Sequence, residues 1–284
     1  MNHDTSGPRR VGQVKDVTSL SNPIIKDIKA LSNKKERDET RSFIAEGLKL
    51  VIDALDLGWT IKTLVYAKAA KGKAQVEQVA LKTVSTGGLV LEVSEKVLSA
   101  ITRRDNPQMV VGVFEQRYSN LRDIRPASGQ TYVALDRVRD PGNLGTIIRT
   151  ADAAGASGII LLGETTDPFS LETVRATMGS VFAMPLMRAT AADFVKWQKG
   201  AGVAVVATHL AGAVDYRSID YSKKPVVLLM GNEQAGLPDE LAREATALAR
   251  IPQQGRADSL NLAIATGIML FEARRHLLIL DDRA

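Results

Sequence analysis

Near-continuous apolar runs recur in the second half of the chain, without alternation of apolar and polar positions. Such runs are typical of parallel strands that are buried on both faces of a sheet. Segments with apolar residues at helical spacing separate the runs, so residues 131–284 are predicted to form an α/β domain. The predicted strands are 132–136, 158–162, 203–207, 226–230 and 247–251, and the predicted helices are 144–154, 171–182, 191–199 and a last one that ends near residue 280.

The first half repeats this alternation on a smaller scale, and residues 18–116 are predicted to form a second α/β domain. Residues 1–17 are polar and without periodicity, which predicts a disordered tail. Residues 117–130 have no apolar pattern and are predicted to be a linker. The predicted strands are 42–45, 63–66, 89–93 and 109–115, and the predicted helices are 21–31, 47–57, about 73–82 and about 95–101.

Charge is distributed unevenly between the two halves. Residues 1–130 hold 21 Lys and Arg against 15 Asp and Glu, whereas residues 131–284 hold 16 against 17, so the net charge of +5 comes from the first half. A basic domain beside a neutral one suggests that one domain binds a polyanion. The alternative is a basic surface that serves only solubility.

Composition excludes several classes of protein. The chain has no cysteine, which excludes disulfides, thiolate nucleophiles and cysteine-based metal sites, and its three histidines (His3, His209 and His276) are too scattered for a metal site. No apolar run is long enough to span a membrane. The polar N-terminus lacks the apolar region of a secretory signal, so a cytoplasmic protein is expected.

Three loops of the second domain carry candidate chemistry, because ligands of open parallel sheets bind beyond the carboxyl ends of the strands. Asn143 follows the first strand, and Arg149 lies six residues later in an apolar helix. The loop after residue 230 brings Gly231, which permits close backbone approach to a ligand, and Glu233, whose carboxylate can accept hydrogen bonds. The loop after residue 251 carries Ser259 and Asn261, which begin the last helix.

Most of these residues also have a purely structural interpretation, although Asn261 in the first turn of its helix is less easily explained in this way. Asn143 and Ser259 can be helix caps. Arg149 can cover the flank of its helix with its aliphatic stem. Glu233 can lie near a helix N-terminus for its interaction with the helix dipole.

Familiar nucleotide and hydrolase motifs are missing. No strand is followed by GxGxxG, and neither GxxxxGK[ST] nor GxSxG occurs. Without a cysteine or a recognisable Ser/His pair, covalent catalysis is disfavoured. Methyl transfer from a sulfonium donor fits what is left, because its leaving group is already activated and the protein needs mainly to position the reactants.

Taken together, the three loops resemble a known family. DRVRDPGNLGTIIRTADAAG, MGNEQAGLPDEL and IPQQGRADSLNLAIAT are similar to motifs 1, 2 and 3 of the SpoU (TrmH) family of S-adenosylmethionine-dependent RNA ribose 2′-O-methyltransferases. The stretch LSNPIIKDIKALSNKKERDETRSFIAEGLKLVIDAL resembles the substrate-binding domain of larger members, which is similar to the ribosomal-protein L30e/L7Ae fold. The resemblance covers nearly everything after residue 18.

The resemblance implies a deep trefoil knot in the C-terminal parallel-sheet domain, with S-adenosylmethionine held in the knot largely by backbone groups. It implies methylation of a ribose 2′-hydroxyl, with 23S-type (large-subunit) ribosomal RNA as the expected substrate. The alternatives are a tRNA substrate or a catalytically silent RNA-binding protein of the same fold. The residues carried over by motif are Asn143, Arg149, Glu233, Ser259 and Asn261 for catalysis, and Thr208, Gly231, Ile251 and Leu260 for the cofactor; no metal is expected.

Arg149 is the key catalytic residue in this assignment. A guanidinium is always protonated in proteins, so it is expected to bind the adjacent RNA phosphate and stabilise the developing alkoxide rather than act as a base. The last helix is apolar on more than one face, whereas covering its own sheet needs only one stripe. A homodimer contact is therefore expected, in agreement with the family.

Overall fold

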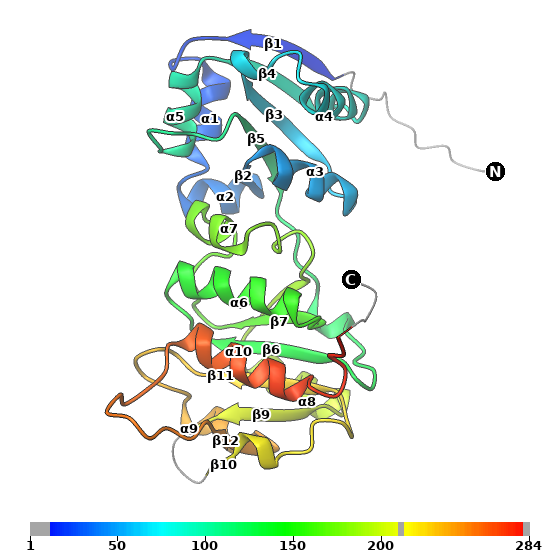
Figure 1. Ribbon diagram of the computed structural model, residues 1–284, viewed down its shortest axis with the longest axis vertical. Helices are drawn as coiled ribbons and strands as arrows, with labels where there is room; N and C mark the ends of the chain where they lie inside the picture. The colour runs from blue at the N-terminus through cyan, green and yellow to red at the C-terminus, as the bar shows by residue number, and fades with distance from the viewer. Residues whose placement is uncertain (1–11, 210–212, 281–284) are drawn as a thin grey trace, which may run out of the picture. The chain divides into compact units, whose positions relative to one another are not determined.

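A computed structural model of the chain describes residues 12–209 and 213–280 (Figure 1). The chain forms two compact units. The N-terminal unit contains the residues up to Gln116 together with Phe169–Arg175, and the C-terminal unit contains Arg117–Pro168 and the residues from Ala176 onward. No helix in the described ranges is both long and apolar enough to cross a membrane.

The N-terminal unit is a five-stranded mixed sheet in the order β1-β4-β3-β5-β2. Strands β1, β3 and β4 run parallel, and β5 is antiparallel to β3 and β2. Apolar residues of α1 and α5 pack against one face of this sheet, while α3 and α4 contact the sheet strands β5, β3 and β4. The elements are β1 Gln13–Val17, α1 Pro23–Ala30, α2 Lys34–Thr40, β2 Ser42–Glu46, α3 Leu48–Asp56, β3 Ile61–Ala67, α4 Ala74–Ser85, β4 Leu89–Val93, α5 Glu95–Thr102 and β5 Val110–Glu115.

A segment from much later in the chain completes the core of this unit. The ring of Phe169, which is 1% exposed, lies 4.7 Å from that of Phe43 between centroids. Arg175 donates from Nε to Oε1 of Glu46, whose side chain is buried, over 3.0 Å. Its guanidinium also donates to the carbonyl of Thr102. The N-terminal unit is thus discontinuous in sequence.

The prediction of a disordered tail over residues 1–17 is wrong for its last five residues. Gln13–Val17 forms strand β1, which pairs in parallel with β4, while residues 1–11 lie outside the described residues. Only Val17 of this strand is buried. An edge strand with both faces largely in solvent lacks the apolar pattern on which the prediction depended.

Residues 34–40 form the charged helix α2, although neither a helix nor a strand was predicted there. Its residues are good helix formers, but they make no apolar stripe that periodicity could detect. Arg37 is buried and donates from a terminal guanidinium nitrogen to the carbonyl of Leu31 over 2.8 Å. The helix is therefore held by a charged residue rather than by an apolar one.

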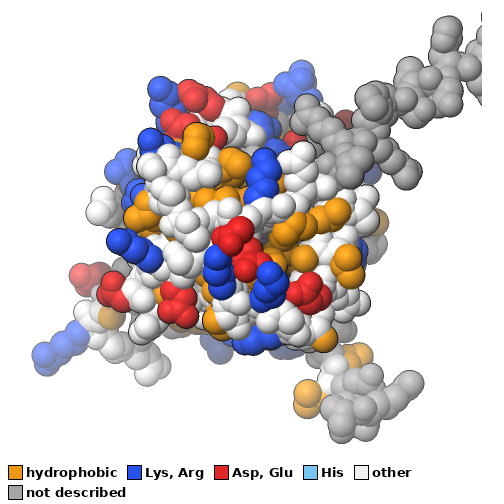
Figure 2. All heavy atoms as spheres, turned by 90° about the horizontal axis from the view of Figure 1, so that it is seen from above, with side chains coloured by type: hydrophobic (Ala, Val, Ile, Leu, Met, Phe, Trp, Pro, Cys, Tyr) orange, Lys and Arg blue, Asp and Glu red, His pale blue; other side chains and the backbone are white. Residues whose placement is uncertain are grey.

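Basic and acidic side chains are interspersed on the end of the N-terminal unit where β1 lies (Figure 2). On β1 and β4, Asp16 and Glu92 pair with Lys68 and Lys71 at 2.6 and 2.9 Å. The basic excess of the first half is thus not gathered at this end of the unit.

The C-terminal unit is a seven-stranded parallel sheet in the order β10-β12-β9-β11-β6-β7-β8. Apolar residues of α8 and α9 pack on one face, and α10 lies beside α6 and contacts β11 (Figure 1). The strands are β6 Thr131–Asp136, β7 Gly158–Leu162, β8 Leu186–Ala189, β9 Ala204–Thr208, β10 Val214–Asp215, β11 Val226–Met230 and β12 Ala247–Arg250, and the helices are α6 Pro141–Ala153, α8 Ala191–Ala201, α9 Asp239–Arg243 and α10 Leu262–Ala273. Helix α7 Leu171–Thr177 belongs to the N-terminal unit as far as Arg175.

The predicted linker and two predicted helices differ from the structure. Residues 117–130 belong to the C-terminal unit, where Leu121 is buried in the core. The helix expected over 171–182 is only α7, because Met178 and Gly179 turn into the left-handed region with φ of 52° and 104°. The last helix ends at Ala273 rather than near residue 280. The β8 and β10 strands, of four and two residues, were not predicted.

Candidate ligand-binding and catalytic site

The candidate site lies where four parallel strands end. Strands β6, β11, β9 and β12 are consecutive neighbours in the sheet, so the loops that follow them meet at one edge. These loops line a cavity of about 720 Å³, a size within the usual range of small-molecule sites. Eight of the nine residues predicted from the sequence line it: Asn143, Thr208, Gly231, Glu233, Ile251, Ser259, Leu260 and Asn261.

A chain of side-chain hydrogen bonds joins the three predicted loops. Nδ2 of Asn143 donates to Oε1 of Glu233 over 3.3 Å, and Nδ2 of Asn261 donates to Oδ1 of Asn143 over 2.9 Å. Oδ1 of Asn261 accepts from the backbone N–H groups of Ala263 and Ile264 at the start of α10. The two hydrogen-bonded pairs, which are 90 and 118 positions apart in sequence, thus present their amide and carboxylate groups as one unit.

The helix caps differ from the structural interpretations considered for the sequence. Asp140, not Asn143, caps α6 by accepting from the backbone N–H of Asn143, and Pro141 at the first helical position fits this cap. Asn261, not Ser259, caps α10. Because Asp140 carries out the capping of α6, the side chain of Asn143 is available to the other loops.

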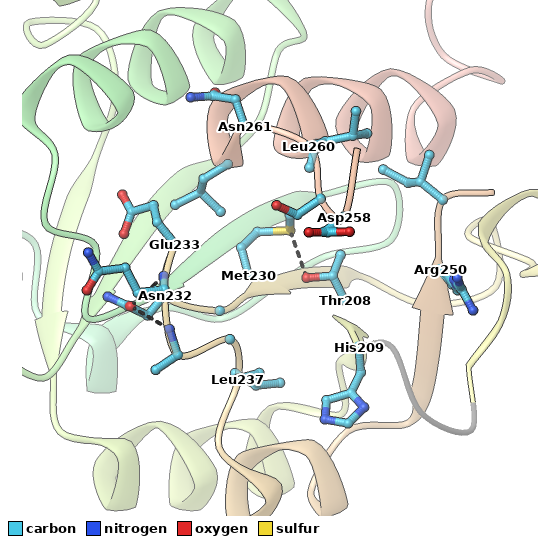
Figure 3. A pocket seen from close by; sticks show the side chains of 18 of the residues that line it. Thr208, His209, Met230, Asn232, Glu233, Leu237, Arg250, Asp258, Leu260 and Asn261 are labelled. Atoms are coloured by element: carbon cyan, nitrogen blue, oxygen red, sulfur yellow. Dashed lines mark hydrogen bonds between the residues drawn. The ribbon is translucent and has the colours of Figure 1, made fainter. Parts of the chain in front are cut away.

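Apolar side chains form much of the cavity wall. Thr208, Met230, Leu237 and Leu260 surround the hollow, and Asp258 stands on the side of Thr208 (Figure 3). Oγ1 of Thr208 lies 3.9 Å from the sulfur of Met230. The combination of an apolar wall with the carboxylates of Glu233 and Asp258 suits a nucleoside-sized ligand that carries a positive charge.

The backbone comes closest together at Gly231. A Cβ at this position would overlap the backbone nitrogen of Leu237 and would lie 2.5 Å from the carbonyl carbon of Gly236. Hydrogen bonds between Asn232 and Gly236, at 3.0 and 2.9 Å, close the loop in both directions. Gly231 therefore leaves no room for a side chain, because its nearest neighbours are backbone atoms of its own loop, and its contact with a ligand stays a prediction.

Arg149 lies outside this cavity. It is exposed on α6, and it forms no hydrogen bond or ion pair with the residues that the structure describes. Six residues separate it from Asn143, which corresponds to about 9 Å along the helix axis. Its guanidinium is therefore available to a ligand that extends beyond the cavity.

A left-handed turn leads from β6 into the first loop. Arg137 has φ of 49°, which is uncommon for a residue other than glycine. Its side chain donates from Nε to Oδ2 of Asp136, which is buried, over 2.9 Å. This hydrogen bond and the negative charge of Asp136 raise the pKa of Arg137. The guanidinium of Arg137 is therefore charged, and its bond to Asp136 fixes the exit of the strand.

Sequence reasoning missed several residues that line the cavity, among them His209, Met230, Asn232, Leu237 and Asp258. Four of these adjoin predicted residues, since His209 follows Thr208, Met230 precedes Gly231, Asn232 precedes Glu233 and Asp258 precedes Ser259. Their places next to motif residues were the one available signal. Within the described part of the chain, no group of three or more His, Asp and Glu could hold a metal ion.

Comparisons with known proteins agree with this site. The family model of the SpoU rRNA Methylase family matches residues 130–271, and that of the MRM3-like substrate binding domain matches residues 22–112. A 23S rRNA (guanosine(2553)-2′-O)-methyltransferase of Bacillus subtilis is 34% identical over 92% of this chain and 100% of its own. A 23S rRNA (uridine(2479)-2′-O)-methyltransferase of Streptomyces viridochromogenes is 32% identical over 86% of each chain.

A solved structure is more similar still. The crystal structure of an AdoMet-bound rRNA methyltransferase from Sinorhizobium meliloti is 82% identical in sequence. It superposes with a TM-score of 0.91 and covers 94% of this chain and 100% of its own. The similarity thus extends over both units of the chain.

Proposed function

The chain belongs to the SpoU methylase family, and we propose that it transfers the methyl group of S-adenosylmethionine to a ribose 2′-hydroxyl of large-subunit ribosomal RNA. The observation that carries this proposal is the hydrogen-bonded chain of Glu233, Asn143 and Asn261 beside a cavity that fits the methyl donor. Relatives that match across both units are named for 23S rRNA, which favours ribosomal RNA over tRNA. A cytoplasmic location is also part of this proposal, and a ribosomal RNA substrate is compatible with it.

In this proposal, some cavity residues bind the methyl donor and others bind the ribose. S-adenosylmethionine, when bound, supplies a methyl group on a sulfonium that leaves readily. Backbone groups of Gly231, Ile251 and Leu260 hold the donor, and Thr208 supports it from the end of β9. The trefoil knot that the family resemblance implies is part of this proposal.

Asn143 and Asn261 orient the ribose, Glu233 fixes the amide of Asn143, and Ser259 contacts the sugar from the loop before α10. The bond between the 2′-oxygen and the methyl carbon forms as the bond from carbon to sulfur breaks, and the hydroxyl proton passes to a phosphate oxygen or to water. Positioning of this kind supplies roughly 7–11 kcal/mol of barrier reduction.

RNA is held by both units in this proposal. The region 18–116 is the substrate-binding part, since its basic excess suits phosphate contacts. Arg149 binds the phosphate next to the target ribose and stabilises charge that develops on the 2′-oxygen.

A homodimer is the second part of the proposal. On α10, Ile264 and Phe271 are 56% and 49% exposed, and Leu277 and Leu278 extend this apolar surface beyond the helix. Burial of such side chains against a second copy removes apolar area from water. Sedimentation equilibrium at micromolar concentration is expected to give twice the chain mass of 30.6 kDa, and a monomer would contradict the dimer.

The proposed reaction is tested with RNA from a strain that lacks the gene. Purified protein and methyl-labelled S-adenosylmethionine are expected to label large-subunit rRNA at one nucleotide, and mapping should show that the same 2′-O-methylation is lost in the strain. Asn143→Ala is the inactive control. Label in tRNA alone would select the alternative substrate, and unchanged methylation profiles of rRNA and tRNA would overturn the proposed function.

Gly231→Ala is expected to lower the affinity for S-adenosylmethionine more than tenfold, because the added Cβ meets backbone atoms that cannot move aside cheaply. Isothermal titration measures this affinity. Gly255→Ala is the matched control, since no atom lies within 4 Å of a Cβ at that position of the third loop. Equal affinities of the two variants would show that the close approach at Gly231 is not needed for donor binding.

A further inference from the structure

Asn232 makes a buried connection between the first two loops of the site. Its side-chain Nδ2 donates to the backbone carbonyl of Arg137 over 2.7 Å. Its Oδ1 accepts from the backbone N–H groups of Gln234 and Ala235 at 2.9 and 3.0 Å. The residue is 8% exposed. One amide therefore closes its own loop through its oxygen and holds the neighbouring loop through its nitrogen.

The contact falls on the left-handed turn of Arg137. Three interactions hold this turn: the backbone N–H of Arg137 donates to the carbonyl of Leu162 over 3.0 Å, its side chain pairs with Asp136, and its carbonyl accepts from Asn232. A left-handed conformation at a residue other than glycine is strained, so it persists only where surrounding contacts fix it. Of these three interactions, only the hydrogen bond from Asn232 comes from the second loop.

The other contacts between the two loops are longer. Glu233 accepts from the backbone N–H of Arg139 at 3.4 Å and from Asn143 at 3.3 Å. Hydrogen bonds of this length are weaker than those near 2.9 Å. The alignment of Glu233 with Asn143 therefore depends on the shorter bond that Asn232 makes to Arg137, the first residue of the first loop.

We propose that Asn232 is a positioning residue, which sets the first loop in register with the second so that Asn143 and Glu233 meet the target ribose. The inference rests on the proposed methyl transfer and deepens it. Loss of this contact should impair turnover and spare donor binding. The groups proposed to hold the donor lie in other loops, except for Gly231, which precedes Asn232 in the second loop.

Asn232→Asp separates the two halves of the connection. The introduced carboxyl keeps both acceptor contacts to Gln234 and Ala235, but when ionised it places an oxygen against the carbonyl of Arg137. The expected kcat is lowered about 10- to 100-fold, the order of loss that a displacement of about 1 Å causes. The Kd for S-adenosylmethionine is expected to stay within threefold.

Two further readouts distinguish positioning from general destabilisation. In the donor-free protein, backbone amides of residues 138–140 should exchange with solvent faster, while those of β11 keep their protection. The ratio of variant to parent kcat should rise as the pH falls toward 5, because a protonated carboxyl can again donate to the carbonyl of Arg137. The charged side chains of Asp136, Arg137 and Glu233 beside this position are the same in both proteins, so the comparison isolates the change at position 232.

Asn120→Asp is the matched control, because Asn120 also accepts from a backbone N–H, that of Arg122, but lies outside the site. Asn232→Ser serves if the first variant does not fold, since a serine hydroxyl can close the loop but cannot reach the first loop.

An unchanged kcat of the folded variants would overturn the proposal, and so would a loss of donor affinity as large as the loss of kcat. If the parent protein methylates no RNA, it is the proposed function that fails, while the exchange of residues 138–140 still tests the connection.

Discussion

Arg149→Ala is expected to lower kcat by 10²- to 10³-fold, about 3–4 kcal/mol, the loss that follows removal of one group that stabilises developing negative charge. Donor affinity should be unchanged, because Arg149 does not line the cavity. Single-turnover methylation of an rRNA fragment measures the chemical step, and titration of S-adenosylmethionine measures binding.

Two control variants sharpen this result. Arg149→Lys retains the charge but not the planar pair of donors, and should recover only part of the rate. Arg122→Ala removes an exposed guanidinium whose ion pair with Asp193 lies on the surface, and should leave kcat within twofold. Near-normal turnover of Arg149→Ala with normal donor binding would show that the assignment of Arg149 is wrong.

Phe169→Ala is expected to lower the free energy of unfolding of the N-terminal unit by about 3–5 kcal/mol, the usual cost of removing a buried phenylalanine ring. The residue lies between β7 and β8 in sequence, yet its ring packs on Phe43. Hydrogen exchange should therefore accelerate in β2 and β5, while amides of β6 and β7 remain protected.

Phe194→Ala is the matched control, because this equally buried ring belongs to the core of the C-terminal unit. It should produce the opposite pattern, with accelerated exchange in β6 and β7. If Phe169→Ala accelerated exchange only in the C-terminal unit, the assignment of Phe169–Arg175 to the N-terminal unit would be contradicted.

The sequence predicted best where burial is symmetrical. Strands β6, β7 and β11 are buried along their whole length, and their apolar runs are accordingly unmistakable. Strand β1 and helix α2 carry no such pattern, because one is an exposed edge strand and the other is held by the buried guanidinium of Arg37. Periodicity detects apolar burial and not hydrogen bonding.

The site followed a similar rule. Its loops could be located because each follows a predicted strand, and the motif resemblance added the roles of Asn143, Glu233 and Asn261. The contact of Asn232 with Arg137 could not be predicted, since it depends on a left-handed turn in one loop and the register of another. The same holds for the caps, where Asp140 and Asn261 replaced equally suitable neighbours.

The discontinuity of the N-terminal unit has a consequence for synthesis on the ribosome. Its own strands are complete once β5 has been made, but the ring of Phe169 and the guanidinium of Arg175 follow more than fifty residues later. At 5–20 residues per second, the nascent unit waits roughly 3–12 s with Phe43 and Glu46 uncovered. The N-terminal unit, although it is translated first, therefore finishes folding only after synthesis of the C-terminal unit has begun.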